Sequence, residues 1–328
     1  MIRIGCLGAG RIGKIHGLNA ANHANATLVA VSDPMAGAAE ALAAMAGAEA
    51  RSAEAIIGAS DIDAVLICTP TTTHADYIEA AARAGKAVFC EKPIDLTSDR
   101  IRSCLAVVKT AGTPLMIGFN RRFDPNFAEL KRRIDAGVVG SVELVTVLSR
   151  DPQPPHAGYV GSSGGLFRDM MIHDLDMARF LLGEDIAEVH AVGSSLVDPA
   201  IGREGDVDTA AVLLKTPTGR IAQISNSRRA TYGYDQRIEV HGSAGLIRAG
   251  NVHRTTVEVA TGAGFNTDPV QDFFLERYAD AYRLEMDAFV TALVEKRAPA
   301  PTGEDGLLAQ VLADAATEAC FSGRPVKL

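Results

Sequence analysis

The stretch Gly8-Ala9-Gly10-Arg11-Ile12-Gly13 follows the first apolar run of the chain, residues 2–7, and precedes a segment with helical pattern, residues 12–24. It is a GxGxxG turn between a predicted strand and a predicted helix. In that context the first Gly makes the tight turn, the second lets a pyrophosphate approach the backbone, and the third lets the helix pack against the strand. The stretch therefore predicts a dinucleotide-binding unit.

An acidic residue stands where such a unit needs one. Asp33 ends the second apolar run, twenty positions beyond Gly13. A carboxylate there accepts hydrogen bonds from both ribose hydroxyls and repels a 2′-phosphate, so NAD is predicted rather than NADP. The alternative is a glycine-rich turn without a ligand, and the flanking strand, helix and acidic residue favour the dinucleotide.

Short apolar runs alternate with helical segments through the first part of the chain. The runs are nearly continuous in Val, Ile, Leu and Cys, a pattern typical of parallel strands covered by helices on both faces. The runs occupy residues 2–7, 28–32, 64–69, 87–91 and 115–118, and the helical segments occupy residues 12–24, 36–46, 74–84 and 98–111. We expect a doubly wound parallel sheet, and hence a Rossmann domain, over residues 1–121.

The pattern changes in the remainder, residues 122–328. Strand-like alternation separated by turn residues predicts a second α/β domain with a largely antiparallel open sheet. The expected helices cover residues 125–136, 168–182, 272–296 and 303–320, the expected strands include 210–215, 220–225, 237–241 and 256–260, and a loop rich in Pro and Gly covers 151–165.

Composition excludes several classes of protein. The 328 residues suit two domains, and the net charge of −8 without a dense basic block makes nucleic acid a poor candidate partner. No run of eighteen apolar residues indicates a membrane span, and the amino terminus lacks a secretory signal pattern, so we expect a cytoplasmic protein. The five cysteines form no CxxC pair, which favours buried thiols in a reducing compartment; they are Cys6, Cys68, Cys90, Cys104 and Cys320.

Two loops that follow predicted strands carry polar residues. One contains Thr69-Pro70 and leads to His74, and the other is Glu91-Lys92-Pro93. Loops after the carboxyl ends of parallel strands line the ligand crevice, so Lys92 is placed to hydrogen-bond a reacting oxygen, and Pro93 suggests an unusual, cis turn. The alternatives are that Thr73 caps the next helix and that Glu-Lys-Pro is a solvated surface turn.

The predicted helix at residues 168–182 holds Asp169, His173 and Asp176 at i, i+4 and i+7, which places them in one polar stripe. His173 could serve as a general base held by Asp169. A solvated polar face is an equally open interpretation. A metal site has less support, because no other His or Cys ligands stand at suitable spacing.

Together these motifs resemble the glucose-fructose oxidoreductase and inositol dehydrogenase family, and the resemblance extends over essentially the whole chain. Within the family, three further stretches are most similar to inositol 2-dehydrogenases. They are residues 118–125, 150–152 and 232–237.

The resemblance implies hydride transfer from an alcohol to NAD, with Lys92, Asp169 and His173 as the catalytic group and no metal. The cofactor-binding residues that it implies are Gly8, Gly10, Arg11, Ile12, Gly13, Asp33, Thr69, Pro70, His74, Glu91 and Lys92. The residues that it implies for polyol recognition are Asn120, Arg121, His156, Asp176 and Tyr234. Four other histidines are expected to be structural or on the surface: His16, His190, His241 and His253.

The implied substrate is myo-inositol, and the implied assembly is a homo-oligomer of the tetrameric kind. Another cyclitol or an aldose is the alternative substrate. A dinucleotide-binding regulator without chemistry is the alternative class, and the complete Lys, Asp and His set disfavours it.

Overall fold

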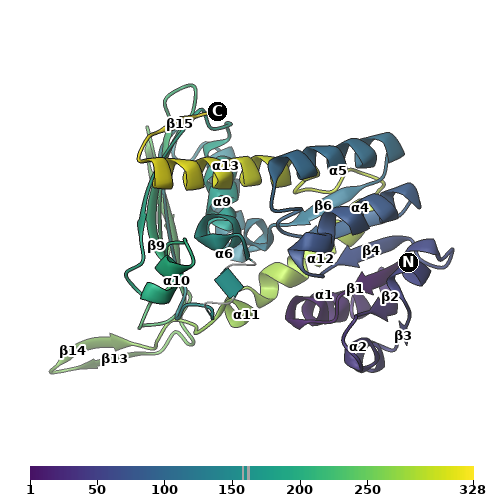
Figure 1. Cartoon of the computed structure of the whole chain (residues 1–328). Coiled ribbons are helices and arrows are strands. Elements are labelled where there is room, and N and C mark those ends of the chain that lie inside the picture. The colour runs from purple at the N-terminus through teal and green to yellow at the C-terminus, as the bar shows by residue number, and fades with distance from the viewer. Residues whose placement is uncertain (157–158, 161–162) are drawn as a thin grey trace. The chain divides into compact units, whose positions relative to one another are not determined.

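A computed structural model describes residues 1–156, 159–160 and 163–328 (Figure 1). The chain forms two compact units. The first comprises Met1–Phe123 and Ala281–Gln310, and the second comprises Asp124–Asp280 and Val311–Leu328.

The first unit is built on a six-stranded sheet in the order β3-β2-β1-β4-β5-β6, and every neighbouring pair is parallel. The strands are β1 (Ile2–Leu7), β2 (Ala26–Ser32), β3 (Glu49–Ala50), β4 (Ala64–Ile67), β5 (Ala87–Glu91) and β6 (Leu115–Gly118). Strand β4 is buried along its whole length, as its continuous apolar run predicts. This confirms the predicted Rossmann sheet.

Helices cover both faces of this sheet, with α1 and α2 on one side and α4 and α5 on the other (Figure 1). The helices are α1 (Arg11–Ala21), α2 (Ala38–Ala46), α3 (Ala53–Gly58), η1 (Thr71–Thr73), α4 (His74–Arg83), α5 (Ser98–Ala111) and η2 (Asn120–Phe123). Gly47 and Gly112 end α2 and α5 in the left-handed conformation, as expected for helix stop signals. Strand β3 and helix α3 were not predicted, since neither is long enough to show a periodic pattern.

The second unit contains a seven-stranded sheet in the order β12-β11-β7-β10-β9-β8-β15. Its strands are β7 (Val142–Arg150), β8 (Glu188–Ser194), β9 (Thr209–Lys215), β10 (Ile221–Ser227), β11 (Asp235–Gly242), β12 (Gly245–Ala249) and β15 (Val326–Lys327). Only the β7–β10 pair is parallel, so the predicted largely antiparallel α/β domain is confirmed.

Helices α6 and α9 pack on one face of this second sheet, α9 against β7 and β10. The helices of the unit include α6 (Pro125–Asp135), α8 (Gly165–Asp169), α9 (Ile172–Leu182), α10 (Pro199–Arg203) and α11 (Phe274–Arg277). The predicted strand at 256–260 lies instead in a separate two-stranded hairpin, β13 (Glu258–Thr261) with β14 (Gly264–Thr267). Its residues are all exposed, so it had no core against which to join the main sheet.

The two carboxyl-terminal helices, α12 (Ala279–Val294) and α13 (Gly303–Ser322), do not follow the single boundary expected after residue 121. Met286, Phe289 and Val290 of α12 lie fully buried in the core cluster of the first unit. Helix α12 therefore belongs to the first unit, because its apolar face is buried there. A single boundary along the sequence cannot represent such a long-range contact. Within the residues described, no helix is long and apolar enough to cross a membrane.

Candidate active site

The glycine-rich turn lies at the carboxyl end of β1, where the strand order reverses between β2 and β4. Gly8 has a φ of 96°, and a Cβ on it would lie 2.5 Å from the carbonyl oxygen of Cys68. A Cβ on Gly13 would lie 1.9 Å from the carbonyl oxygen of Gly8. A Cβ on Gly10 would meet nothing within 4 Å. The turn is therefore closed on the protein side and open at Gly10, which suits the approach of a pyrophosphate.

Asp33 follows β2 and holds this turn from the side. One carboxylate oxygen accepts the backbone N–H of Ala9 at 2.6 Å, and the other accepts that of Met35 at 2.7 Å. The side chain is partly exposed, so it can also meet a ligand. These contacts connect the acidic residue to the glycine turn.

The loop after β4 is fixed by hydrogen bonds of its own. The Thr73 hydroxyl donates to Thr69 Oγ1 and contacts the Pro70 carbonyl oxygen at 2.8 Å. Thr73 occupies the N-cap position of α4, as the alternative interpretation has it, but its side chain makes no capping bond there. His74 is buried, with Nδ1 2.7 Å from the carbonyl oxygen of Pro93 and Nε2 2.7 Å from that of Thr69. Burial lowers the pKa of its imidazole. His74 thus connects the loops after β4 and β5.

The Glu91-Lys92-Pro93 turn ends β5 and contains the expected cis peptide bond, between Lys92 and Pro93. Glu91 Oε2 accepts the backbone N–H of Lys92 at 3.2 Å, and Glu91 Oε1 lies 2.7 Å from Nε2 of His16. Lys92 itself is partly exposed. Two other predicted residues, Asn120 and Arg121, follow β6 and are 3% and 5% exposed.

In the second unit the Asp169 carboxylate is held by two residues that the sequence analysis did not single out. Tyr159 donates its hydroxyl at 3.1 Å, and Arg228 donates from Nη2 at 3.3 Å. Burial, and next the charge of Asp169, raises the pKa of the Tyr159 phenol, which keeps it a donor. Arg228 lies just beyond β10, and Tyr159 lies in a helical stretch within the segment predicted as a loop, so no local spacing pointed to either.

The predicted single helix over 168–182 is wrong. Asp169 is the last residue of α8, and α9 begins at Ile172. The Met171 N–H bonds to the Leu166 carbonyl at 2.9 Å, five residues back, and Asp174 N–H bonds to that of Met171 at 2.8 Å. The wide turn ends one helix and starts another, so Asp169 does not share a helical stripe with His173 and Asp176.

His173 and Asp176 both lie on α9, the first partly exposed and the second buried. Asp174 beside them is fully buried and accepts a hydrogen bond from Nδ2 of Asn226 at 2.8 Å. Met171, Leu175, Ala178 and Leu182 are all buried, as expected for the stripe that faces the core. Buried carboxylates are uncommon unless they are paired, and the Asn226 amide supplies such a partner to Asp174.

Tyr234 and His156 differ in their setting. Tyr234 is 6% exposed and packs edge-on against Tyr278 with ring centroids 6.0 Å apart, while the Tyr278 hydroxyl donates to Gln236 at 3.2 Å. His156 is exposed, and residues 157–158 and 161–162 of the predicted loop lie outside the described residues. The two side chains are thus a buried aromatic and a surface imidazole.

A glycine turn at the switch point of a six-stranded parallel sheet, with an acidic residue after the second strand, defines a dinucleotide-binding protein. Residues 2–119 match the family described as oxidoreductase family, NAD-binding Rossmann fold, and residues 131–328 match the oxidoreductase family, C-terminal alpha/beta domain. The chain therefore belongs to this oxidoreductase family, the one its motifs resemble, and its cofactor is NAD.

The relatives match along their whole length. An inositol 2-dehydrogenase from Rhizobium meliloti (strain 1021) is 54% identical over 327 residues, which covers 100% of this chain and 99% of that protein. The crystal structure of a myo-inositol dehydrogenase from Corynebacterium glutamicum superposes with a TM-score of 0.96 at 41% identity, covering 100% and 99% of the two chains. That of scyllo-inositol dehydrogenase from Lactobacillus casei, with NAD(H) and scyllo-inositol bound, has a TM-score of 0.93 at 32% identity with the same coverage.

Proposed function

We propose that this protein is an NAD-dependent inositol 2-dehydrogenase, which oxidises one secondary hydroxyl of myo-inositol to the inosose. The observation that carries the proposal is the 54% identity over the full chain to a protein named for that activity. The open face at Gly10 and the carboxylate of Asp33 fit the pyrophosphate and ribose of NAD.

In this proposal Lys92, Asp169 and His173 form the catalytic group. His173 takes the hydroxyl proton, and Lys92 orients the same oxygen and stabilises its developing negative charge. Asp169, whose carboxylate Arg228 and Tyr159 hold in place, orients the imidazole. When NAD is bound, C4 of its nicotinamide accepts the hydride that leaves the substrate carbon bearing this hydroxyl. The carbon thus loses two electrons with the hydride, and the proton leaves through His173.

The remaining predicted residues are assigned to the two ligands. Polar side chains that pair with many hydroxyls allow a site to discriminate between polyols. We assign NAD contacts to Arg11, Ile12, Thr69, Pro70, His74 and Glu91, and polyol contacts to Asn120, Arg121, His156, Asp176 and Tyr234.

The test measures NADH formation with purified protein, NAD, and a panel of myo-inositol, scyllo-inositol, glucose and xylose, with NADP in parallel. We expect the highest kcat/KM with myo-inositol and NAD. A preference for scyllo-inositol would instead place the protein with the Lactobacillus casei relative, and a preference for glucose or xylose would assign it to an aldose. Absence of turnover despite NAD binding would favour a regulator.

Two variants test the residue roles. Removing a general base costs about 10²–10⁴ in rate, so His173→Asn should lower kcat by that factor. Removing an oxyanion donor costs about 10²–10³, which we expect of Lys92→Met. His253→Asn and Lys109→Met are matched controls at exposed positions outside the second sheet, where kcat should not change. Near-normal kcat in either site variant, with NAD still bound, would contradict its assigned role.

We further propose that the second sheet assembles subunits through its outer face, giving a homotetramer. Register places several exposed apolar side chains on that face: Ile221 lies opposite Leu144, and Val192 lies diagonally from Leu213, whose direct partner is His190. Leu213 is 50% exposed and Val192 69%. Exposed apolar side chains gathered on one face mark an interaction surface.

Light scattering with size exclusion tests the assembly. Leu213→Arg should lower the molar mass from four subunits to fewer, while Met45→Lys, exposed on α2 of the first unit, should leave it unchanged. An unchanged mass in Leu213→Arg would place the interface elsewhere.

A further inference from the structure

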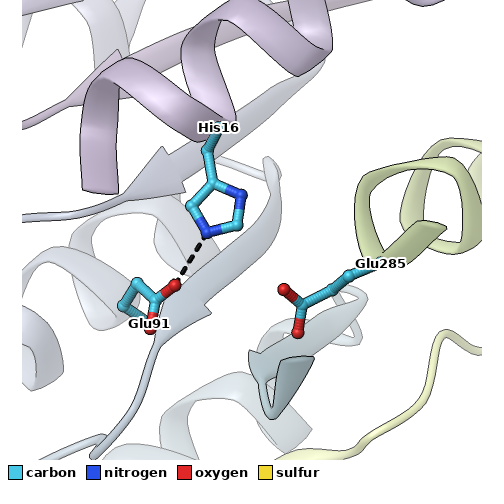
Figure 2. Close-up of side chains that lie close together, drawn as sticks. All are labelled: His16, Glu91 and Glu285. Atoms are coloured by element: carbon cyan, nitrogen blue, oxygen red, sulfur yellow. Dashed lines mark hydrogen bonds and ion pairs between the residues drawn. The ribbon is translucent and has the colours of Figure 1, made fainter. Parts of the chain in front are cut away.

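Three ionisable side chains converge inside the first unit, and two of them, His16 and Glu285, have no role in the proposed chemistry. They are His16 of α1, Glu91 at the end of β5 and Glu285 of α12, and Figure 2 shows Glu285 pointing toward the other two. One nitrogen or oxygen atom from each lies within 4.8 Å of those of the other two. His16 and Glu285 are both fully buried. Their burial among core residues makes every unpaired charge there costly.

Glu91 connects this cluster to Lys92. Its Oε1 is 2.7 Å from His16 Nε2, and its Oε2 accepts the backbone N–H of Lys92 at 3.2 Å. A Cβ on Gly118 of β6 would lie 3.1–3.2 Å from the same carboxylate, so a side chain there would have to displace the carboxylate slightly. A shift of Glu91 would therefore be transmitted to the backbone of the Lys92 turn.

Glu285 is the unexplained member. Neither of its carboxyl oxygens has a hydrogen-bond partner among the described residues, and the Nδ1 atom of His16 has none either. The walls are aromatic: the His16 ring packs 4.7 Å from that of Phe89 and 5.5 Å from that of Tyr282. A carboxylate left ionised here would face a second carboxylate across an apolar space, a situation in which one of the two keeps its proton.

The buried position of Glu285 beside Glu91 determines its protonation state. Burial, and next the negative charge of Glu91, raises the pKa of Glu285 well above its usual range. A neutral carboxylic acid has one O–H donor, and acceptors are at hand, since the Glu91 carboxylate and a ring nitrogen of His16 each have an atom within 4.8 Å of a Glu285 oxygen. A small displacement, or one buried water of the kind that commonly fills such polar gaps, completes the bond.

A bound divalent cation is the competing explanation, because two carboxylates and an imidazole are metal ligands. A ligating histidine ordinarily donates its second ring N–H to an acceptor, and His16 Nδ1 has no such acceptor among the described residues. The direct 2.7 Å contact between His16 and Glu91 also already uses the atoms that would bind the ion.

We propose that Glu285 is a positioning residue for Lys92: it is a neutral carboxylic acid that donates a hydrogen bond, directly or through one water, to the His16–Glu91 pair, and so fixes Glu91 beside the Lys92 turn. The inference rests on the proposed role of Lys92 in hydride transfer. Glu285 itself does not touch the reacting atoms.

Infrared difference spectroscopy on the full chain tests the protonation without measuring activity. The carbonyl band of a protonated carboxylic acid should be present at neutral pH in the wild type. It should vanish in Glu285→Gln and remain in the matched control Glu295→Gln, a residue 56% exposed beyond the end of α12. Absence of the band from the wild type at neutral pH would overturn the proposal.

Kinetics test the positioning. Glu285→Ala should lower kcat by about 10–100-fold, because small misplacements of a catalytic group cost rates of that order, while the Kd for NAD stays within about threefold. Glu285→Gln keeps a donor of the same shape and should restore most of the lost kcat. An unchanged kcat in Glu285→Ala, or equal losses in both variants, would overturn the proposal.

Metal analysis separates the competing explanation. One equivalent of metal per wild-type chain, lost in Glu285→Gln, would show that Glu285 is an ionised ligand and refute the proposal. If Glu285→Ala fails to fold, the infrared band and Glu285→Gln still decide. If no substrate is turned over by the wild type, the proposed function fails, whereas the infrared result still tests the neutral acid.

Discussion

Two alanine substitutions in the glycine turn should have opposite consequences, and the difference tests the assignment of the cofactor site. A Cβ on Gly13 would lie 1.9 Å from the carbonyl oxygen of Gly8, so Gly13→Ala forces α1 away from β1. A Cβ on Gly10 would meet nothing within 4 Å, and its φ of −67° suits an alanine. The first change should damage the fold, and the second should damage only the approach of NAD.

The magnitudes follow from these distances. Overpacking costs about 1–3 kcal/mol and occasionally more, and a contact this short belongs at the upper end. At about 2–4 °C per kcal/mol for a unit of this size, Gly13→Ala should lower Tm by about 6–12 °C. Gly10→Ala should change the free energy of unfolding by no more than about 0.5 kcal/mol. Its Kd for NAD should rise about 10–100-fold, equivalent to about 1.4–2.8 kcal/mol.

Calorimetric unfolding without cofactor and NAD titration at one temperature provide the two measurements. Wild-type NAD affinity in Gly10→Ala would refute the placement of the pyrophosphate against this turn. A wild-type Tm in Gly13→Ala would refute the close packing of helix and strand.

Three further predictions concern other ionisable groups. Asp33→Ala should raise the Kd for NAD about tenfold and reduce the preference for NAD over NADP, because the carboxylate that accepts from the ribose and repels a 2′-phosphate is lost. An unchanged ratio of the Kd values for NAD and NADP in titrations would contradict this. Arg277 and Asp124 form an ion pair with both side chains at most 2% exposed, so Arg277→Met should cost about 3–5 kcal/mol in urea unfolding, and a loss under about 1 kcal/mol would show that the remaining Asp124 carboxylate is not desolvated. The pKa of Glu285 is raised in the folded state, so the stability that its proton contributes is lost as the pH rises above the pKa that this side chain has in the unfolded chain. The Tm of Glu285→Gln minus that of the wild type should therefore increase between pH 5 and pH 8. A Tm difference that stays constant over this range would contradict the raised pKa.

The first unit could be predicted well because its signals are local. Each buried parallel strand is a continuous apolar run, and the glycine turn and Asp33 sit at fixed positions relative to the first two strands. Strand β3 and helix α3 were missed because two and six residues are too few for a period to emerge. Tertiary contacts with the neighbouring strand define them.

The features of the second unit that the sequence did not predict depend on contacts between residues far apart in the chain. The break between α8 and α9 consists of Met170 and Met171, two buried apolar residues that are compatible with an uninterrupted helix. Arg228, which binds Asp169, lies 59 positions further along the chain. A spacing rule finds partners one helical turn apart, and these partners are joined only by the folded sheet.

The residues proposed for catalysis and binding stay predictions from sequence resemblance. The structure adds what surrounds them: Glu91 and its neighbours next to Lys92, and Tyr159 with Arg228 next to Asp169. None of those supporting residues has a motif of its own, because a supporting role is set by contact and not by spacing.

The His74 ring determines how the loops after β4 and β5 are held to each other. Its ring stands between two carbonyl oxygens, each 2.7 Å away, and a neutral imidazole has a hydrogen to offer to only one of them. Burial lowers its pKa, so the neutral ring prevails near neutral pH and its single hydrogen can be given to Thr69 or to Pro93. Each tautomer therefore binds one loop, the one after β4 or the one after β5, and turns a nitrogen lone pair toward the carbonyl oxygen of the other.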